Sequence, residues 1–434
     1  MIRREAVVEY VSAALWVMPF AAGAASILAG AGLSHVEGTP GSLIHAISFQ
    51  GNSGQARDLL TAITGSVVTV IALVLGLSVV ALQMASTQFS PRLLRNFLRD
   101  RPNQIVLSIF IATFAYSASG LYTVGTGPDP EAFPRLAVSG SIAMLFASLG
   151  AVVFFADHLS HSIQVDAIMQ RVERESVAVV GRLHGDVDLV PPEPRPWAAA
   201  IAARTSGYVV TAHPEILLPL ARQYGVSIAL TKRVGEHVVA GRTLAQIWMP
   251  TPQDALPDLA VFEEALDKAV GIGFERTRQQ DAAMGIRQLV DTACKALSPA
   301  VNDPYTAVQA VDHMSVIFTA LAQHSLGPFV GSSGESVVVV PSRRFGEYLA
   351  TMCGLVRRYG AGEPTVALAL LRLLENCATV VKDDWSRLSS IRTEAKLILA
   401  DAERETRQEA DLLPVRAAQE ALLRRIEKYR RTAN

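Results

Sequence analysis

The amino-acid sequence predicts a membrane domain of four transmembrane α-helices, followed by a cytoplasmic α+β domain that combines a small β-module with helices. Composition supports this prediction, because 50% of the 434 residues are hydrophobic and 18% are charged, whereas soluble domains average about one-quarter charged residues. The charges are also unevenly distributed: 16 of the first 160 residues are charged, compared with 63 of the remaining 274. Both observations argue against a purely cytosolic enzyme.

Four uncharged apolar runs justify the membrane domain, which we place at residues 1–160. A transmembrane helix needs about 20 apolar residues, because no backbone polar group can remain unpaired in hydrocarbon. The first run exceeds the apolar core of a secretory signal peptide and lacks a cleavage context, so we interpret it as a span. The four runs extend over residues 11–33, 59–86, 105–125 and 136–156.

The basic residues between these runs predict their orientation. Cytoplasmic loops of membrane proteins carry an excess of Lys and Arg. The first and third loops hold only Arg57 and Arg135, whereas the segments on the other side of the predicted membrane are richer in arginine. We therefore expect a multi-pass membrane protein with both termini in the cytoplasm. The cytoplasmic arginines are Arg3, Arg4, Arg92, Arg95, Arg99, Arg101, Arg171 and Arg174.

The second predicted span ends in a polar face. Gln83, Thr87 and Ser90 recur at helical spacing, and Thr69 and Gly76 continue the same side upstream. Such a face can line a water-filled path through a membrane. The alternative is helix–helix packing, in which small and hydroxyl residues allow neighbouring helices to approach and to form hydrogen bonds. The sequence leaves both interpretations open.

Three arginines follow this polar face. Ser90 and Pro91 have the pattern of an N-cap and a first helical residue, so we expect a new helix here. Arg92, Arg95 and Arg99 would share one side of it, at the cytoplasmic mouth of the membrane domain. They could attract anions or bind anionic lipid headgroups. Alternatively, they only fix the orientation of the spans.

The inner end of the fourth span carries a candidate metal or proton site. Asp157 and His161 are four residues apart, and His158 and His161 are three apart. A carboxylate and imidazoles can therefore share one helix face. Structural metal sites use three or four ligands, so a single helix supplies too few, and ordinary interfacial polar residues are the alternative.

The cytoplasmic domain is expected to begin with a connecting helix and a Pro-rich linker over residues 161–197. Val165, Ile168 and Val172 repeat at the spacing of an amphipathic helix. The segment VPPEPRPW at 190–197 then breaks the pattern. This organisation separates the membrane domain from the domain that follows.

A small β-module is predicted over residues 198–250. Short runs such as SGYVV and VSIAL are rich in β-branched residues, and Gly235 and Gly241 punctuate the segment after them. The spacing of short strands and glycines in this segment, GYV…VGEHVVAGRTLAQI, resembles that of the hammerhead and barrel-sandwich modules of biotinyl and lipoyl domains. The resemblance implies a fold and no carrier function, because Lys232 precedes the matching segment and no lysine lies at a hairpin tip.

Residues 251–434 are predicted to be mainly helical. We expect a helix over 262–274, a buried strand over 336–341, and a long charged helix over 391–431 that breaks near Pro414. The strand is indicated by the run SVVVVP, and the last helix by opposite charges four residues apart.

One polar group in this helical part is a candidate ligand site. Asn302, Asp303 and Pro304 have the pattern of a helix start. Together with Arg287, Asn302 and Asp303 could bind a ligand at that helix terminus. Helix capping alone is the alternative explanation.

Several function classes lack support in the sequence. No GxGxxG, Walker, HExxH or GxSxG pattern occurs, so we expect no cofactor, and the sequence leans away from an enzyme without excluding one. A net charge of −1 argues against a nucleic-acid partner. Cys294, Cys353 and Cys377 have no CxxC spacing and are expected to be reduced thiols.

Two long motifs resemble those of a known family. Residues 77–101, LSVVALQMASTQFSPRLLRNFLRDR, and residues 285–312, GIRQLVDTACKALSPAVNDPYTAVQAVD, are similar to the bacterial membrane proteins grouped as domain of unknown function 2254. The motif SGYV at 206–209 also fits this family. The resemblance extends over nearly the whole chain. It implies an inner-membrane protein and assigns no activity or catalytic residue.

These observations lead to two functional hypotheses. The first is a homo-oligomeric ion or small-solute channel, gated by its cytoplasmic domain, because four helices are few to enclose a path alone. The alternative is a non-conducting scaffold or sensor whose cytoplasmic domain binds a partner or a small ligand. In either case the expected partners are the lipid bilayer, further copies of the chain and a small ligand or ion.

Overall fold

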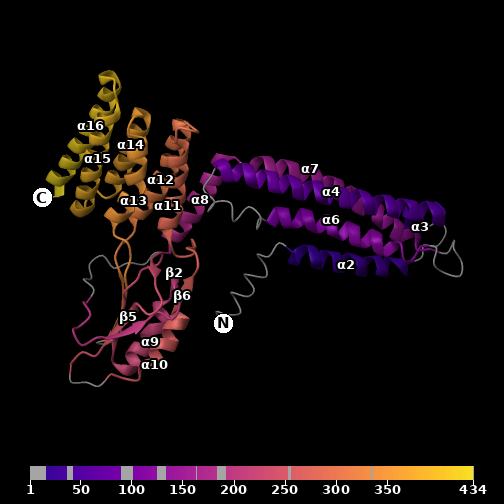
Figure 1. Cartoon of the computed structure of the whole chain (residues 1–434), viewed down its shortest axis with the longest axis horizontal. Coiled ribbons are helices and arrows are strands. Elements are labelled where there is room, and N and C mark those ends of the chain that lie inside the picture. The colour runs from indigo at the N-terminus through magenta and orange to yellow at the C-terminus, as the bar shows by residue number, and fades with distance from the viewer. Residues whose placement is uncertain are drawn as a thin grey trace. The chain divides into compact units, whose positions relative to one another are not determined.

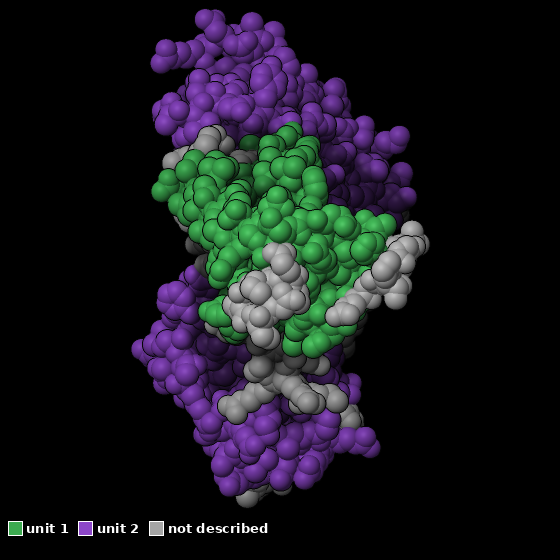
Figure 2. Space-filling view, turned by 90° about the vertical axis from the view of Figure 1, so that its right-hand side faces the viewer, with its two compact units in different colours: residues 1–167 green, residues 168–434 purple. Residues whose placement is uncertain are grey.

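The chain divides into two compact units. A computed structural model describes residues 16–36, 43–88, 101–124, 133–162, 164–182, 192–252, 256–333 and 336–433. The amino-terminal unit is Met1–Ala167 and the carboxyl-terminal unit is Ile168–Asn434, shown in different colours in Figure 2. The protein has a mostly helical body with some β-sheet, so the coarse fold class expected from the sequence is confirmed.

The amino-terminal unit consists of long helices that lie side by side (Figure 1). One of them, α6, contacts each of the other three long helices. The elements are α2 (Val17–Ser34), the short α3 (Leu43–Ile47), α4 (Ser53–Gln88), α6 (Arg101–Gly120) and α7 (Arg135–Ser162). Apolar side chains of α4, α6 and α7 form a shared core, which contains Ile63, Val67, Val74, Val106, Phe110, Ala151 and Phe155.

Three described helices are long and apolar enough to cross a membrane. They are α2, α4 over Ser53–Gln83 and α7 over Arg135–His161. The run expected at 105–125 forms α6, which is not among the three. Its first turn contains Arg101, Asn103 and Gln104, and these polar residues lower its mean hydropathy. Three of the four expected membrane helices are thus supported among the described residues.

Two sheets lie in the carboxyl-terminal unit. The larger has the strand order β1-β5-β3-β8-β7 and the smaller the order β4-β2-β6. Among the described strands, only β3 and β8 pair in parallel, with Ile228 opposite Val338. The strands are β1 (Ala199–Ala202), β2 (Gly207–Ala212), β3 (Ser227–Leu230), β4 (His237–Val238), β5 (Thr243–Trp248), β6 (Val270–Gly273), β7 (Phe329–Ser333) and β8 (Ser336–Val340).

Strands from distant parts of the sequence complete the larger sheet. β7 and β8 come from residues 329–340, far beyond the segment 198–250. A parallel pair needs a long crossover connection, and here several helices lie between β3 and β8. The strands of residues 198–250 therefore do not form a self-contained barrel-sandwich of the kind that the sequence resembled.

Two helices pack on the strands. α9 (Pro214–Tyr224) and α10 (Leu259–Ala269) contribute Leu217 and Phe262 to the core that also holds Ile228 of β3. The helix expected over 262–274 is wrong at its end, because the chain continues from α10 directly into β6. A Cβ on Gly271 of β6 would lie 2.5 Å from Thr211 Oγ1, so glycine allows β6 to pair closely with β2.

The remaining helices pack against one another (Figure 1). Asp303 and Asp384 cap α12 and α15 with their carboxylates. The expected break near Pro414 is also wrong, because it lies at residues 406–408 and Pro414 is in the second turn of the last helix. These helices are α8 (Val165–Val180), α11 (Ala282–Ala296), α12 (Pro304–Gln323), α13 (Phe345–Tyr359), α14 (Pro364–Val380), α15 (Trp385–Glu405) and α16 (Glu409–Ala433).

Candidate ligand-binding site

The polar face predicted on the second span is exposed where the structure describes it. Gln83, Gly76 and Thr69 all lie on the outside of α4. Thr87 is in the last turn of α4, but its side chain lies outside the described residues, as do Ser90, Arg92, Arg95 and Arg99. In the single chain, this face therefore points away from the other helices.

The interior of the amino-terminal unit instead holds polar residues from α6 and α7, which the sequence analysis did not single out. The hydroxyl groups of Thr113 on α6 and Ser148 on α7 lie 2.8 Å apart, and both residues are buried. Ser108 of α6 donates to the carbonyl of Gln104. The Thr113–Ser148 contact joins two helices, as hydroxyl pairs do within membranes, whereas the Ser108 bond lies within α6.

The candidate metal group at the inner end of α7 is only partly assembled. His161 Nδ1 lies 3.6 Å from Asp157 Oδ1, and both side chains are largely exposed. His158 instead stacks on Phe154, with ring centroids 6.0 Å apart. Within the described residues, no three His, Cys, Asp or Glu side chains cluster in a way that could hold a metal ion.

The candidate ligand group in the helical part is divided between local contacts. Asp303 Oδ1 and Oδ2 accept from the backbone N–H and the hydroxyl of Thr306, over 3.1 and 2.6 Å. These two bonds lower the pKa of Asp303. Arg287 pairs with Asp291 one turn along its own helix, over 3.3 Å. Asn302 is exposed and has a φ of 49°, so it serves the tight connection into α12.

A different polar cluster begins at the turn between β3 and β4. Glu236 N donates to Arg233 O over 3.1 Å, which closes the turn. Arg233 Nε also lies 2.9 Å from Glu236 Oε1. Gly235 has a φ of 87°, which favours glycine. A Cβ there would lie 2.3 Å from Asp281 Oδ2, so the turn packs directly against Asp281.

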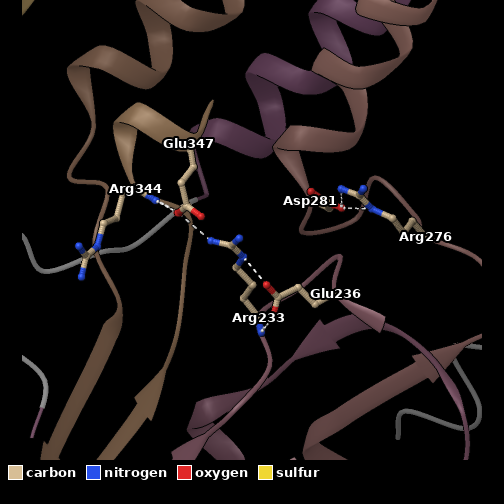
Figure 3. Close-up of polar contacts among 6 residues, drawn as sticks. All are labelled: Arg233, Glu236, Arg276, Asp281, Arg344 and Glu347. Atoms are coloured by element: carbon tan, nitrogen blue, oxygen red, sulfur yellow. Dashed lines mark hydrogen bonds and ion pairs between the residues drawn. The ribbon is translucent and has the colours of Figure 1, made fainter. Parts of the chain in front are cut away.

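Asp281 is a buried carboxylate at the start of α11, only 4% exposed. Arg276 Nε and Nη2 donate to its Oδ2 over 2.8 and 2.5 Å (Figure 3). A buried charge is tolerated when an opposite charge and hydrogen bonds compensate it. Arg276 therefore compensates the buried negative charge of Asp281.

Glu347, near the start of α13, connects this helix to the turn between β3 and β4. Its carboxylate accepts from Arg233 Nη1 over 2.7 Å and from the backbone N–H of Arg344 over 2.9 Å (Figure 3). The bond from Arg233 is the main cause that lowers the pKa of Glu347, while partial burial opposes it. The guanidinium of Arg233 thus lies between two carboxylates, those of Glu236 and Glu347.

A cavity of about 610 Å³ adjoins this cluster, a volume in the range of small-molecule sites. Its walls come from the end of α8, the β2–α9 connection, the turn at Arg233, the segment before α11 and the residues after β8. The lining residues are Val179, Arg182, Thr211, Ala212, His213, Pro214, Glu215, Arg233, Val234, Gln279, Gln280, Asp281, Phe329, Val340, Pro341, Ser342, Arg343 and Tyr348.

Arg343 is the unusual residue of this wall. Its Nε is buried and has no hydrogen-bond partner, and the described residues provide no ion pair for its guanidinium. Burial lowers the pKa of Arg343, and the cations of Arg233 and Arg276 lower it further, against a smaller opposing effect of Asp281. Arginine nevertheless stays charged at neutral pH. Among the described residues, the charge of Arg343 therefore has no ion-paired carboxylate, although Asp281 lies near enough to act on it.

Tyr348 adds a neutral donor to the same wall. It is 5% exposed, and burial raises its pKa to about 12. Its hydroxyl group is therefore protonated at neutral pH and can donate a hydrogen bond. Gln280 Oε1 accepts from Ala212 N over 2.8 Å, which fixes that amide beside the cavity.

Residues 12–376 match the family model described as predicted membrane protein, DUF2254. This chain belongs to the DUF2254 family. Two mycobacterial proteins, from Mycobacterium bovis and Mycobacterium tuberculosis, are each 41% identical to it over 422 residues, which cover 94% of this chain and 80% of theirs. Both relatives are named uncharacterized proteins. No solved structure matches the chain.

The family resemblance expected from the sequence is thus confirmed, and it extends over most of the chain. The DUF2254 match includes Arg233, Asp281, Arg343 and Glu347. Sequence reasoning missed these residues as a site, although two signals were present. A double arginine, Arg343 and Arg344, follows the end of the strand β8 after two intervening residues, and a Gly-containing turn carries opposite charges at its ends.

Proposed function

We propose that this DUF2254 protein is a ligand sensor of the bacterial inner membrane. Its carboxyl-terminal unit would bind a small molecule in the 610 Å³ cavity, and α8 would transmit binding to the membrane helices. One observation carries this proposal: Val179, in the last turn of α8, and Arg182, two residues after its end, line the cavity. The other end of α8 follows α7, separated from it by two residues.

Three contacts support α8 as a firmly seated element of the carboxyl-terminal unit. Glu173 Oε2 lies 2.6 Å from His313 Nδ1 of α12, and Glu175 lies 2.7 Å from Arg278. Ser176 is buried so close to α11 that a Cβ on Gly285 would lie 1.9 Å from its hydroxyl oxygen. A ligand that changes the packing at Val179 would therefore act on a helix with little freedom to relax locally.

The membrane topology is part of the proposal. We place four spans in the bilayer, with α6 as the fourth, because it packs among α2, α4 and α7. An even number of spans puts both termini on one side, and the arginine distribution favours the cytoplasm. The carboxyl-terminal unit would then sample small molecules inside the cell.

Hydrogen exchange of the full-length protein in lipid nanodiscs tests whether α8 is coupled to α7. Gly285→Ala should displace α8, since the new Cβ meets Ser176. We expect faster exchange over Val165–Val180 and at the end of α7. Gly354→Ala on α13 is the matched control, because a Cβ there meets no atom within 4 Å. Unchanged exchange in α7 despite a displaced α8 would defeat the sensor proposal.

A channel is the second candidate, favoured by the exposed face of α4. Gln83 and Thr69 lie on the outside of α4, in its long apolar part, where contact with lipid is costly for Gln83. A second copy of the chain would cover this face and form a shared path. Gln83→Leu should then reduce conductance and weaken oligomers in nanodiscs, whereas Thr61→Val on the same helix should not. Normal assembly and conductance in Gln83→Leu would remove this candidate.

A further inference from the structure

We infer that the ligand of the 610 Å³ cavity is a small organic anion with one oxyanion head group, a phosphate or a carboxylate, bound by the guanidinium of Arg343. This inference rests on the proposed function, since it identifies the class of ligand for the same cavity. The charges of the wall point to the head group, and its apolar part and volume point to the body of the ligand.

The three arginines of the cluster differ in their partners. Arg276 is occupied by Asp281, and Arg233 by Glu236 and Glu347. Within the part of the chain that the structure describes, Arg343 alone among these three has no ion-paired carboxylate. Its Nε, like that of Arg233, is buried without a hydrogen-bond acceptor. Leaving a buried donor unsatisfied costs stability, and more so for a charged group. A site that retains this cost is suited to a ligand that supplies the missing acceptor.

Guanidinium chemistry determines which head group fits. Its planar arrangement of donors matches the two oxygens of a carboxylate or phosphate in a bidentate pair. The Tyr348 hydroxyl offers a further donor on the same wall. One unmatched cation balances one anionic group, so a single head group is expected.

The rest of the cavity requires a larger body on the ligand. A volume of about 610 Å³ far exceeds that of a free phosphate or carboxylate ion. Apolar side chains from four elements face it, including Val179, Val234, Phe329 and Val340. Apolar walls with a few placed polar groups are characteristic of organic-ligand sites. Inorganic phosphate alone would therefore leave most of the cavity unfilled.

Three probes with one shared body test the inference by fluorine NMR on the full-length protein in nanodiscs. They are para-trifluoromethylphenyl phosphate, para-trifluoromethylbenzoate and the neutral para-trifluoromethylbenzyl alcohol. We expect saturable binding of at least one anion, at least about tenfold tighter than the alcohol. The anion that binds more tightly identifies the head group. Equal binding of the alcohol, or saturable binding of neither anion, would overturn the inference.

The variant Arg343→Gln tests whether Arg343 is the residue that binds the anionic probe. It should weaken the anion by at least about tenfold, whereas Arg372→Gln, which removes an exposed arginine paired with Asp312, should not. Without a probe, Arg343→Gln should also raise the unfolding temperature by about 2–4 °C, because an unmatched charge is removed. Unchanged affinity, or a lower unfolding temperature, in Arg343→Gln would refute the role of Arg343.

The two proposals fail in different ways. Anion binding without any change in the hydrogen exchange of α8 would end the sensor proposal and leave the ligand class intact. Equal binding of the neutral alcohol, with altered exchange in α8, would end the ligand class and leave the sensor intact.

Discussion

The two units of this protein differ in the polar groups that they bury. In the amino-terminal unit the buried groups are mainly hydroxyls, such as Ser108 and Thr113, which donate to carbonyls of their own helix. In the carboxyl-terminal unit they include full charges, such as Asp281 and Glu394, held by arginines. Placing a charge in the hydrocarbon of a membrane is costly. A protein interior outside the membrane tolerates a buried charge when an opposite charge is paired with it. Arg343 is informative because its neighbours Arg233 and Arg276 are paired with carboxylates, whereas the described residues provide no ion pair for Arg343.

Removing the cation of a buried ion triad should have the largest effect. Arg357 of α13 bonds Glu394 over 3.1 Å and also contacts Asp401, and both carboxylates are less than 10% exposed. Arg357→Met leaves them without that partner, so we expect a loss of about 3–5 kcal/mol in the free energy of unfolding. Denaturant titration in micelles, followed by tryptophan fluorescence, measures this loss. Equal losses in Arg357→Met and in Arg404→Gln, whose arginine is 66% exposed, would contradict the importance of burial.

Gly235→Ala tests the close packing of the turn on Asp281. Gly235 and Gly241 both have a positive φ, of 87° and 80°, so alanine costs about 1–3 kcal/mol of backbone strain at either position. Of the two positions, only Gly235 has atoms in the path of the new Cβ, namely the Asp281 carboxylate and Arg276 Nη2. We expect Gly235→Ala to lower the unfolding temperature clearly more than Gly241→Ala. Similar decreases in the two variants would show that the turn tolerates the added atom.

The ion pair of Glu347 should appear in the pH dependence of stability. Its folded pKa is lowered below the ordinary value of 4.5, so its contribution is present above about pH 4.5 and is lost as the pH falls through the folded pKa. At pH 7, Glu347→Gln should cost about 1 kcal/mol, allowing for the 43% exposure of the side chain. The difference from wild type should shrink at pH 3.5. A constant difference would argue against this electrostatic origin, and Glu420→Gln, at an exposed helix pair, is the control.

The smallest effect is expected in the amino-terminal unit. Thr113→Val removes the contact with Ser148 between α6 and α7, and should cost about 0.6 kcal/mol, a typical value for a hydrogen bond within a membrane. Circular dichroism during titration with dodecyl sulfate measures this change, with exposed Thr61→Val as the control. A cost as large as that of Arg357→Met would abolish the contrast between the units.

The membrane helices could be predicted from sequence because their signal is local. A run of about 20 apolar residues identifies a span without knowledge of its neighbours, and α2, α4 and α7 follow such runs. The run that became α6 was less informative, since its first turn is polar and its role depends on the helices around it. The ends of α10 and α15 were missed because β6 and the break at 406–408 depend on tertiary packing and pairing.

The cavity could not be predicted because its residues are distant in sequence. Arg233 and Glu347 are separated by 114 positions, and no periodic pattern connects them. They meet because β8 pairs with β3 and because α13 starts shortly after β8. By contrast, Asp303 was expected as a helix cap from its immediate neighbours, and the structure places it in that role.

The parallel pairing of β3 with β8 also affects how the protein is made. During translation, β3 leaves the ribosome 105 residues before β8, as residues 231–335 lie between them. Until Ser336 has emerged, β3 has a strand on only one side, and Ile228 and Leu230 lack part of their cover. An open apolar edge favours aggregation. A nascent chain that stalls in this interval would therefore present an aggregation-prone strand.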